Sequence, residues 1–345
     1  ALGAVATAAM FLIGRGDWLF ASLLFVLGNI GLSGANVFYN SLLPHIARED
    51  EMDRVSSAGY ALGYLGGGLL LTINLTWIVF PGAFGLADGE VATRLCFVSV
   101  AVWWLGFSIP LFRSVPEPPR RLEEGEVTGL NPVRVGVKRL TETFHEIRGY
   151  RHAFLFLLAF LAYNDGIGTI NGMAAAYGTE IGLARSHLIG AILVVQFVGM
   201  PCTFLAGILA GRLGTKRTLY LALAVYVVIS ALAYFMTTAL HFYALAILVG
   251  AVIGGSQALS RSLYASLIPR HKSAEFFSFL TVGSKFAGIL GPAIFGWVSL
   301  LAGSSRLSIL AIAAFFIVGM ALLTRVDVPA GQRYAQQADR AFHAA

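Results

Sequence analysis

The sequence predicts an all-α membrane protein made of two pseudo-symmetric six-helix bundles, of which about ten helices are present. Apolar residues make up 57% of the chain and charged residues 12%, against about 45 to 50% and about 25% in soluble domains. The chain also repeats the pattern Y-x-S-L-[L/I]-P, first as Tyr39 to Pro44 and again as Tyr264 to Pro269. Together, these observations predict a duplicated, membrane-embedded chain.

Each copy of the repeat closes a long apolar run and precedes a short charged connector and a glycine-rich apolar run. The two copies are roughly 225 residues apart, far above the roughly 20 to 50 residues of solenoid and propeller repeats. The repeated unit is therefore half a protein, and duplicated halves in a membrane are typical of transporters.

Apolar runs of about 17 to 25 residues mark segments that can cross a bilayer. We expect such spans near residues 19–46, 56–80, 95–112, 153–177, 188–211, 217–237, 241–268, 276–301 and 305–325. Residues 1–13 add a tenth apolar piece, which lacks the features of a signal peptide and is predicted to be a truncated helix. The repeat pairs the second visible span with the eighth, so two further helices are expected upstream.

The expected domains are an N-terminal bundle (1–112), a linker with an amphipathic helix (113–152), a C-terminal six-helix bundle (153–326) and a tail (327–345). One helical face of the linker carries Val133, Val137, Leu140, Phe144 and Ile147. Basic residues crowd the rest of that helix. It is expected either on the inner membrane surface or as a solvated linker helix.

Lys and Arg residues gather in alternate connectors. The connectors near residues 47, 113, 212 and 270 and the tail are basic, whereas the others hold only Arg15, Arg94, Arg185 and Arg306. The positive-inside rule then predicts a multi-pass protein of the cell membrane (the inner membrane in a bacterium) with a cytoplasmic C-terminus. This topology explains the sequence pI of 9.4 without a nucleic-acid partner.

The connector Gly207-x-Leu209-Ala210-Gly211-Arg212-x-Gly214-x-Lys216-Arg217 resembles the G-x-L-A-D-R-x-G-x-[R/K]-[R/K] signature of the major facilitator superfamily, with Gly211 in place of the acidic residue. More narrowly, the chain resembles the autophagy-related vacuolar amino-acid effluxer family. That resemblance is carried by Phe38 to Pro44, Gly59 to Gly68, Tyr163 to Gly166, Gln257 to Ser262 and Ala274 to Phe277. It implies a secondary transporter with a central cavity between two six-helix domains, and amino-acid export as the leading activity.

Three full charges fall inside expected spans: Asp165, Arg261 and Lys285. Each costs roughly 2.5 to 3.5 kcal/mol at a helix centre, so each needs a partner or water. One interpretation is a buried latch in which Asp165 pairs with Lys285 or Arg261. The other is a cavity in which Arg261 grips a carboxylate, while Asp165 holds a substrate ammonium or carries a coupling proton.

Polar side chains form stripes on several of these helices. Steps of four, three and four residues place Asn29, Ser33, Asn36 and Asn40 on one helical face, and Asn164 lies beside Asp165. Such amides either line a cavity or bond between helices. The candidate binding or coupling set is Asp165, Arg261, Lys285, Asn164, Asn36, Asn40, Asn29, Gln257 and Tyr64.

An enzyme is not expected, because the chain has no H-E-x-x-H, G-x-S-x-G or Walker A pattern. The lone cysteines Cys96 and Cys202 lie in apolar runs and fit packing better than a metal site. No cofactor is expected, and the predicted partners of a monomer are the lipid bilayer and a small polar solute. A non-transporting receptor or a lipid-handling protein on the same helices remains the alternative.

Overall fold

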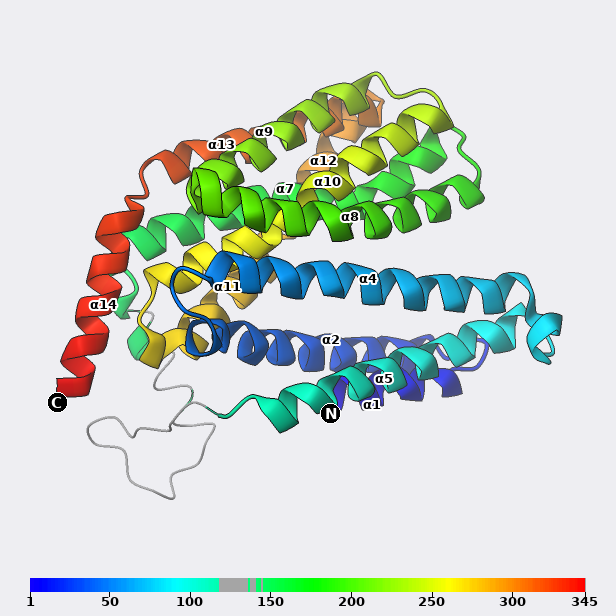
Figure 1. The fold of residues 1–345 in the computed structure, drawn as a ribbon. Helices are drawn as coiled ribbons and strands as arrows, with labels where there is room; N and C mark the ends of the chain where they lie inside the picture. Colours follow the sequence, from blue (N-terminus) through cyan, green and yellow to red (C-terminus); the bar gives the residue numbers. More distant parts are fainter. Residues whose placement is uncertain (118–135, 137–140, 144, 345) are drawn as a thin grey trace. The chain divides into compact units, whose positions relative to one another are not determined.

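A computed structural model describes residues 1–117, 136, 141–143 and 145–344, and all regular structure in this part of the chain is helical (Figure 1). Nine of its helical segments are long and apolar enough to cross a membrane, which confirms the all-α membrane fold. A shorter apolar helix covers Leu2–Leu12. The nine segments are Trp18–Ile46, Met52–Val79, Gly89–Ser114, Arg151–Glu180, Arg185–Leu213, Thr215–Tyr234, Ala239–Leu267, Arg270–Ala302 and Ser305–Thr324.

The described residues form α-helices and short 3₁₀ helices. In chain order they are α1 (Leu2–Ala9), η1 (Met10–Leu12), α2 (Trp18–Ser41), α3 (Leu43–Ile46), α4 (Met52–Val79), η2 (Pro81–Phe84), α5 (Gly89–Ser114), α7 (Arg151–Glu180), α8 (Arg185–Leu213), α9 (Thr215–Tyr234), α10 (Ala239–Leu267), η3 (Arg270–Lys272), α11 (Ser273–Ala287), α12 (Leu290–Ala302), α13 (Ser305–Thr324) and α14 (Val328–Ala344). Of the predicted linker helix, Val133, Val137, Leu140 and Phe144 lie outside the described residues, whereas Ile147 is buried.

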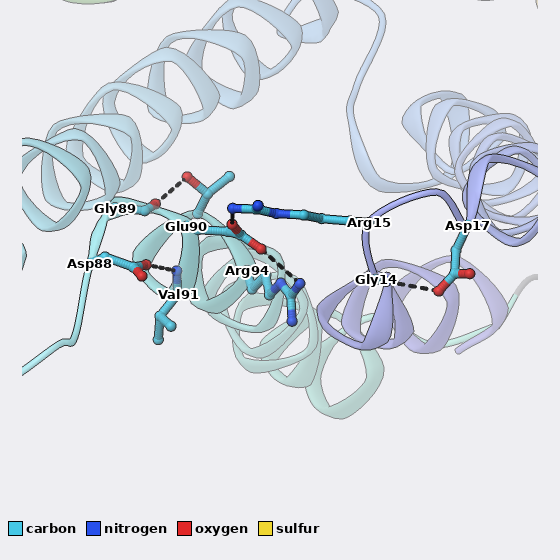
Figure 2. A network of polar contacts seen from close by, with 9 residues as sticks. Gly14, Arg15, Asp17, Asp88, Gly89, Glu90, Val91 and Arg94 are labelled. Atoms are coloured by element: carbon cyan, nitrogen blue, oxygen red, sulfur yellow. Dashed lines mark hydrogen bonds and ion pairs between the residues drawn. The ribbon is translucent and has the colours of Figure 1, made fainter.

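Polar residues in the connectors cap and tie the helices that follow. Asp88 caps α5 by accepting a hydrogen bond of 2.9 Å from the backbone N–H of Val91 (Figure 2). Glu90 in the next turn accepts from Arg15 at 2.7 Å and from Arg94 at 2.9 Å. Because these ion pairs are largely exposed and screened by water, they add little to stability and mainly fix the connector.

The described chain divides into two compact units. The first unit holds residues 1–39 and 66–120, and the second holds residues 40–65 and 121–345. Residues 40–65 include all of the first repeat copy except Tyr39, yet they cluster with the second copy. The predicted division into bundles at 1–112 and 153–326 stays a prediction.

Within the first unit, close backbone approach joins the apolar helices. Gly31 of α2 lies directly against Gly3 of α1, and the Trp104 ring of α5 covers Gly3. A side chain at either glycine would collide with the neighbouring helix, so small residues are required at this contact. Ser99 of α5 donates a hydrogen bond of 2.8 Å to the Asn74 side chain of α4 and adds a polar tie.

The second unit has a large buried core. Aromatic side chains dominate it, and the Tyr226 and Phe316 rings stack with centroids 4.9 Å apart. Tyr163 of α7 keeps its buried hydroxyl bonded to Ser260 of α10 at 2.5 Å. The ring stack joins α9 to α13, and the hydroxyl bond joins α7 to α10.

One expected span, residues 276–301, is broken into α11 and α12 (Figure 1). The break lies at Gly288 and Ile289, shortly before Pro292. Proline lacks the N–H that would bond the carbonyl four residues earlier, and its ring presses on that carbonyl. For Pro292 that carbonyl belongs to Gly288, so the interruption falls one turn before the proline.

The C-terminal helix α14 binds the connector that follows the second repeat. The Asp339 carboxylate lies 2.7 Å from Nδ1 of His271 and accepts a hydrogen bond of 3.0 Å from the backbone N–H of Arg270. Phe342 stacks on the His271 ring at 4.1 Å. Burial by itself would raise the pKa of Asp339, but these hydrogen bonds outweigh it and lower the pKa below its ordinary value of 3.8.

Candidate functional site

Arg261 is buried on α10, where its guanidinium is held by Asn40 of the first repeat copy and by Ser56 and Tyr60 of α4. Its Nε donates to Ser56 Oγ at 3.0 Å, and its Nη2 donates to the Ser56 carbonyl at 3.3 Å. Nη1 donates to the Asn40 side chain at 3.3 Å, and the Tyr60 ring centroid lies 5.0 Å from the guanidinium carbon. All three guanidinium nitrogens therefore bond protein oxygens, and a ring face adds cation–π attraction.

Asp53 makes a second polar contact between α4 and the helices of the second half. The sequence did not single out this residue. Its carboxylate accepts a short hydrogen bond from Ser262, the residue after Arg261, and another of 2.6 Å from Thr215. One acid in the first turn of α4 thus bridges α10 and the start of α9. Its position in the charged connector after Pro44 was a visible signal, but its partners were not.

Glycines let α4 approach the helices that it contacts. A Cβ on Gly207 would stand 2.7 Å from Ser57 Cβ, and Tyr64 lies against Gly199 and Gly254. Any larger residue at these positions would push α4 away from α8 and α10. This close packing gives a physical reason for Gly207, the first residue of the signature-like connector. We call the contacts of Arg261, Asp53, Ser56 and Gly207 between α4 and α8 to α10 the α4 junction.

Asp165 of α7 is 2% exposed, and within the described part of the chain neither carboxylate oxygen has a hydrogen-bond partner. The carboxylate faces the backbone of Gly291, immediately after the α11–α12 break, where a Cβ would overlap Thr169 Oγ1. A buried, uncompensated carboxylate is costly, which makes this a candidate site for a proton or a cation.

The predicted latch between the membrane charges is not formed in this structure. Among the described residues, no hydrogen bond or ion pair joins Asp165 to Arg261 or Lys285. Lys285 is exposed on the last turn of α11. Arg261 is therefore buried and hydrogen-bonded, Asp165 is buried without a hydrogen-bond partner among the described residues, and Lys285 is exposed.

Of the predicted amides, two meet. Gln257 of α10 donates a hydrogen bond of 2.9 Å to the Asn164 side chain of α7. Asn40 bonds Arg261, whereas Asn29 donates to the Phe25 carbonyl of its own helix at 3.0 Å. Asn36 is exposed on α2 in the first unit. Whether any of these residues contacts a solute stays a prediction.

A cavity of about 480 Å³ lies within the second unit. Its wall is formed by α7, α8, α9, α10 and α13, with Phe295 of α12 and Tyr64 of α4. Tyr64, a predicted site residue, thus connects the α4 junction to the cavity. Gln196 and Asn171 also line it.

A family model described as "Vacuole effluxer Atg22 like" matches residues 1–336. The chain belongs to this family. Among relatives, the uncharacterized MFS-type transporter YxiO of Bacillus subtilis (strain 168) is 36% identical over 336 residues, covering 97% of this chain and 77% of YxiO. Autophagy-related protein 22 of Yarrowia lipolytica is 29% identical over 315 residues, covering 82% of this chain and 52% of that protein, so this chain spans about half of it.

Solved structures show the fold of this Atg22-like chain. The E. coli fucose:proton symporter FucP matches with a TM-score of 0.68 and 14% identity, over 94% of this chain and 81% of FucP. The proton:xylose symporter XylE matches with the same TM-score and identity, over 94% of this chain and 78% of XylE. The fold is that of the major facilitator superfamily. The family match over residues 1–336 and the 36% identity to an MFS-type transporter, together with this fold, make the chain a multi-pass membrane transporter of that superfamily and not an enzyme, as the sequence predicts.

Proposed function

We propose that this Atg22-like chain is a secondary active transporter that moves a small polar solute by alternating access, with amino-acid efflux as the leading activity. The observation that carries the proposal is the α4 junction. It ties residues 40–65, which the repeat assigns to the first half, to α8, α9 and α10 of the second half.

Alternating access needs contacts between halves that form in one state and break in another. The α4 junction has the required chemistry, because it is built from hydrogen bonds and small-residue packing that can separate without unfolding a helix. By the positive-inside rule, its connectors face the cytoplasm. We infer that it closes the cytoplasmic end of the solute path.

Asp165 is the proposed coupling residue. Its carboxylate is buried and has no side-chain partner among the described residues, so it can take a proton or a substrate ammonium without first breaking a side-chain contact. Asn164, Gln257 and Asn40 are the further proposed lining residues. We expect a monomer in the cell membrane with a cytoplasmic C-terminus.

A cross-link tests the proposal. Cysteines at Asp53 and Thr215, in a chain with Cys96 and Cys202 replaced by serine, stand where two side chains already meet at 2.6 Å across the α4 junction, so oxidation can join them. In proteoliposomes preloaded with leucine, phenylalanine, lysine, aspartate or fucose, we expect exchange of at least one solute. Oxidation should stop the exchange, and a thiol reductant should restore it.

Each single-cysteine variant is the matched control, and its exchange rate should be the same with and without the oxidant. If the oxidised pair exchanges solute at the unlinked rate, the α4 junction does not open during transport. If the unmodified chain binds solutes but exchanges none, the alternative of a non-transporting receptor or lipid-handling protein is favoured instead.

A further inference from the structure

The cavity in the second unit has a wall without any full charge. Its lining includes six polar side chains, and the rest are aliphatic or aromatic groups or methionines. The six are Tyr64, Thr169, Asn171, Tyr177, Gln196 and Ser230. Such a wall is typical of sites that bind a mostly apolar molecule and orient it with a few polar groups.

Three of these six polar groups are already occupied by the protein. Thr169 donates to the Asp165 carbonyl at 2.8 Å, Ser230 to the Tyr226 carbonyl at 3.0 Å, and Tyr177 to the Ala233 carbonyl at 3.1 Å. Their hydroxyl protons are therefore used inside the bundle. They present little unsatisfied polarity to the cavity.

The other three polar groups are Tyr64, Asn171 and Gln196. None of their side chains makes a hydrogen bond with the described residues. An amide offers both a donor and an acceptor, so Asn171 and Gln196 can each bond one neutral polar group of a ligand. They cannot compensate an ionised group.

Charged side chains stand behind the wall and not in it. Asp165 lies one turn from Thr169, and Arg306 lies beside Tyr177, but neither lines the cavity. Arg261, which the sequence predicts to bind a carboxylate, donates hydrogen bonds from its guanidinium to Ser56 and Asn40. An ion entering the cavity would lose its hydration and gain no counter-charge.

We propose that this cavity binds the uncharged, largely apolar part of the transported solute: a ring or a branched chain with at most one or two neutral polar groups. The proposal rests on the proposed function, because it takes the cavity as part of the solute site. About 480 Å³ is within the roughly 300 to 1,000 Å³ typical of small-molecule sites. Solutes with a charge on this group are excluded by the cost of desolvation.

A matched pair of ligands tests the charge rule. Indole-3-acetamide and indole-3-acetate share one ring, but only the second is an anion near pH 7. Binding to the full chain in nanodiscs is measured by saturation-transfer NMR, with titration for affinity. We expect the amide to bind and the acetate to bind about tenfold more weakly or worse. Equal affinity, or no binding of either ring, overturns the proposal.

Variants place the binding in this cavity. Ala246→Trp fills it from α10, and Leu221→Trp on the exposed face of α9 adds the same ring outside it. The first should abolish indole-3-acetamide binding, and the second should leave it unchanged. Ala191→Leu is a smaller filling change for use if Ala246→Trp does not fold. Equal losses in the filling and the exposed variant would show that the ring binds elsewhere.

The polar contact has its own control. Gln196→Leu should weaken binding of indole-3-acetamide but leave unsubstituted indole unchanged, because only the acetamide has the group that the amide bonds. Failure of this proposal and of the proposed function differ. If the ring binds but no solute is exchanged, the proposed transport function is overturned and the proposal for the cavity stands. If solute is exchanged but the ring does not bind, the proposal for the cavity is overturned and the proposed transport function stands.

Discussion

Two stretches of α10 use opposite chemistry. Residues 256–262 carry serines and Arg261, and their polar groups bond to the protein, within the helix or across to α4 and α7. Earlier in the same helix, Phe242, Leu245, Ala246, Val249 and Ile253 present an apolar wall to the cavity. The polar stretch holds helices together, whereas the apolar stretch leaves space. Satisfied polar groups thus indicate a junction, and unsatisfied ones beside a cavity indicate a ligand.

The largest expected effect comes from breaking the polar stretch at its centre. Arg261→Ala removes the cation and leaves Ser56 and Asn40 without their donors, so we expect solute exchange to fall at least about 100-fold. Arg261→Lys keeps the charge but loses the planar fork, so it should be intermediate. Both are measured in proteoliposomes, with membrane insertion checked by size-exclusion profile. Unchanged exchange by Arg261→Ala would contradict any essential role.

A smaller effect is expected at Asp339, where a satisfied carboxylate lies outside the membrane spans. Because its pKa is lowered on folding, its stabilisation is present above its ordinary value of 3.8 and is lost as pH falls through the folded value. Asp339→Asn should therefore reduce unfolding free energy by about 1 to 3 kcal/mol near neutral pH. Thermal unfolding from about pH 6 to about pH 3 should show this difference shrinking. A difference that grows on acidification would contradict the assignment.

The smallest effect is expected for the amide pair between α7 and α10. Interhelical hydrogen bonds in membranes contribute about 0.6 kcal/mol on average. A double-mutant cycle with Asn164→Ala and Gln257→Ala, read by unfolding in detergent, should give a coupling of this size. A coupling free energy near zero together with a large loss of transport would indicate that the pair contacts the solute and does not stabilise the helix contact.

Much of the fold could be predicted because a bilayer restricts what a chain can do. Every span of about 20 apolar residues must be helical there, so composition and length locate the helices within a few residues. The break before Pro292 is also a local consequence of the sequence, although its position at Gly288 follows from backbone bonding and not from the proline's own place.

The candidate site could be predicted only in part. The free-energy cost of a charge in a membrane singles out Asp165, Arg261 and Lys285. That cost does not identify which residue or ligand compensates each charge. Asp53 gave a weaker signal because an acid in a connector is ordinary. Its role depends on Ser262 and Thr215, which are far from it in sequence.

The sequence by itself determined that this chain is a duplicated helical membrane protein, where its helices lie and which buried charges need an explanation. Hydrophobicity and periodicity are local properties, and the membrane turns them directly into structure. Only the tertiary structure decided that Arg261 bonds Ser56 and Asn40, that Asp165 has no such partner, and that an uncharged cavity lies along α10. Those outcomes depend on which helices touch, and contacts between distant residues are not encoded at either residue alone.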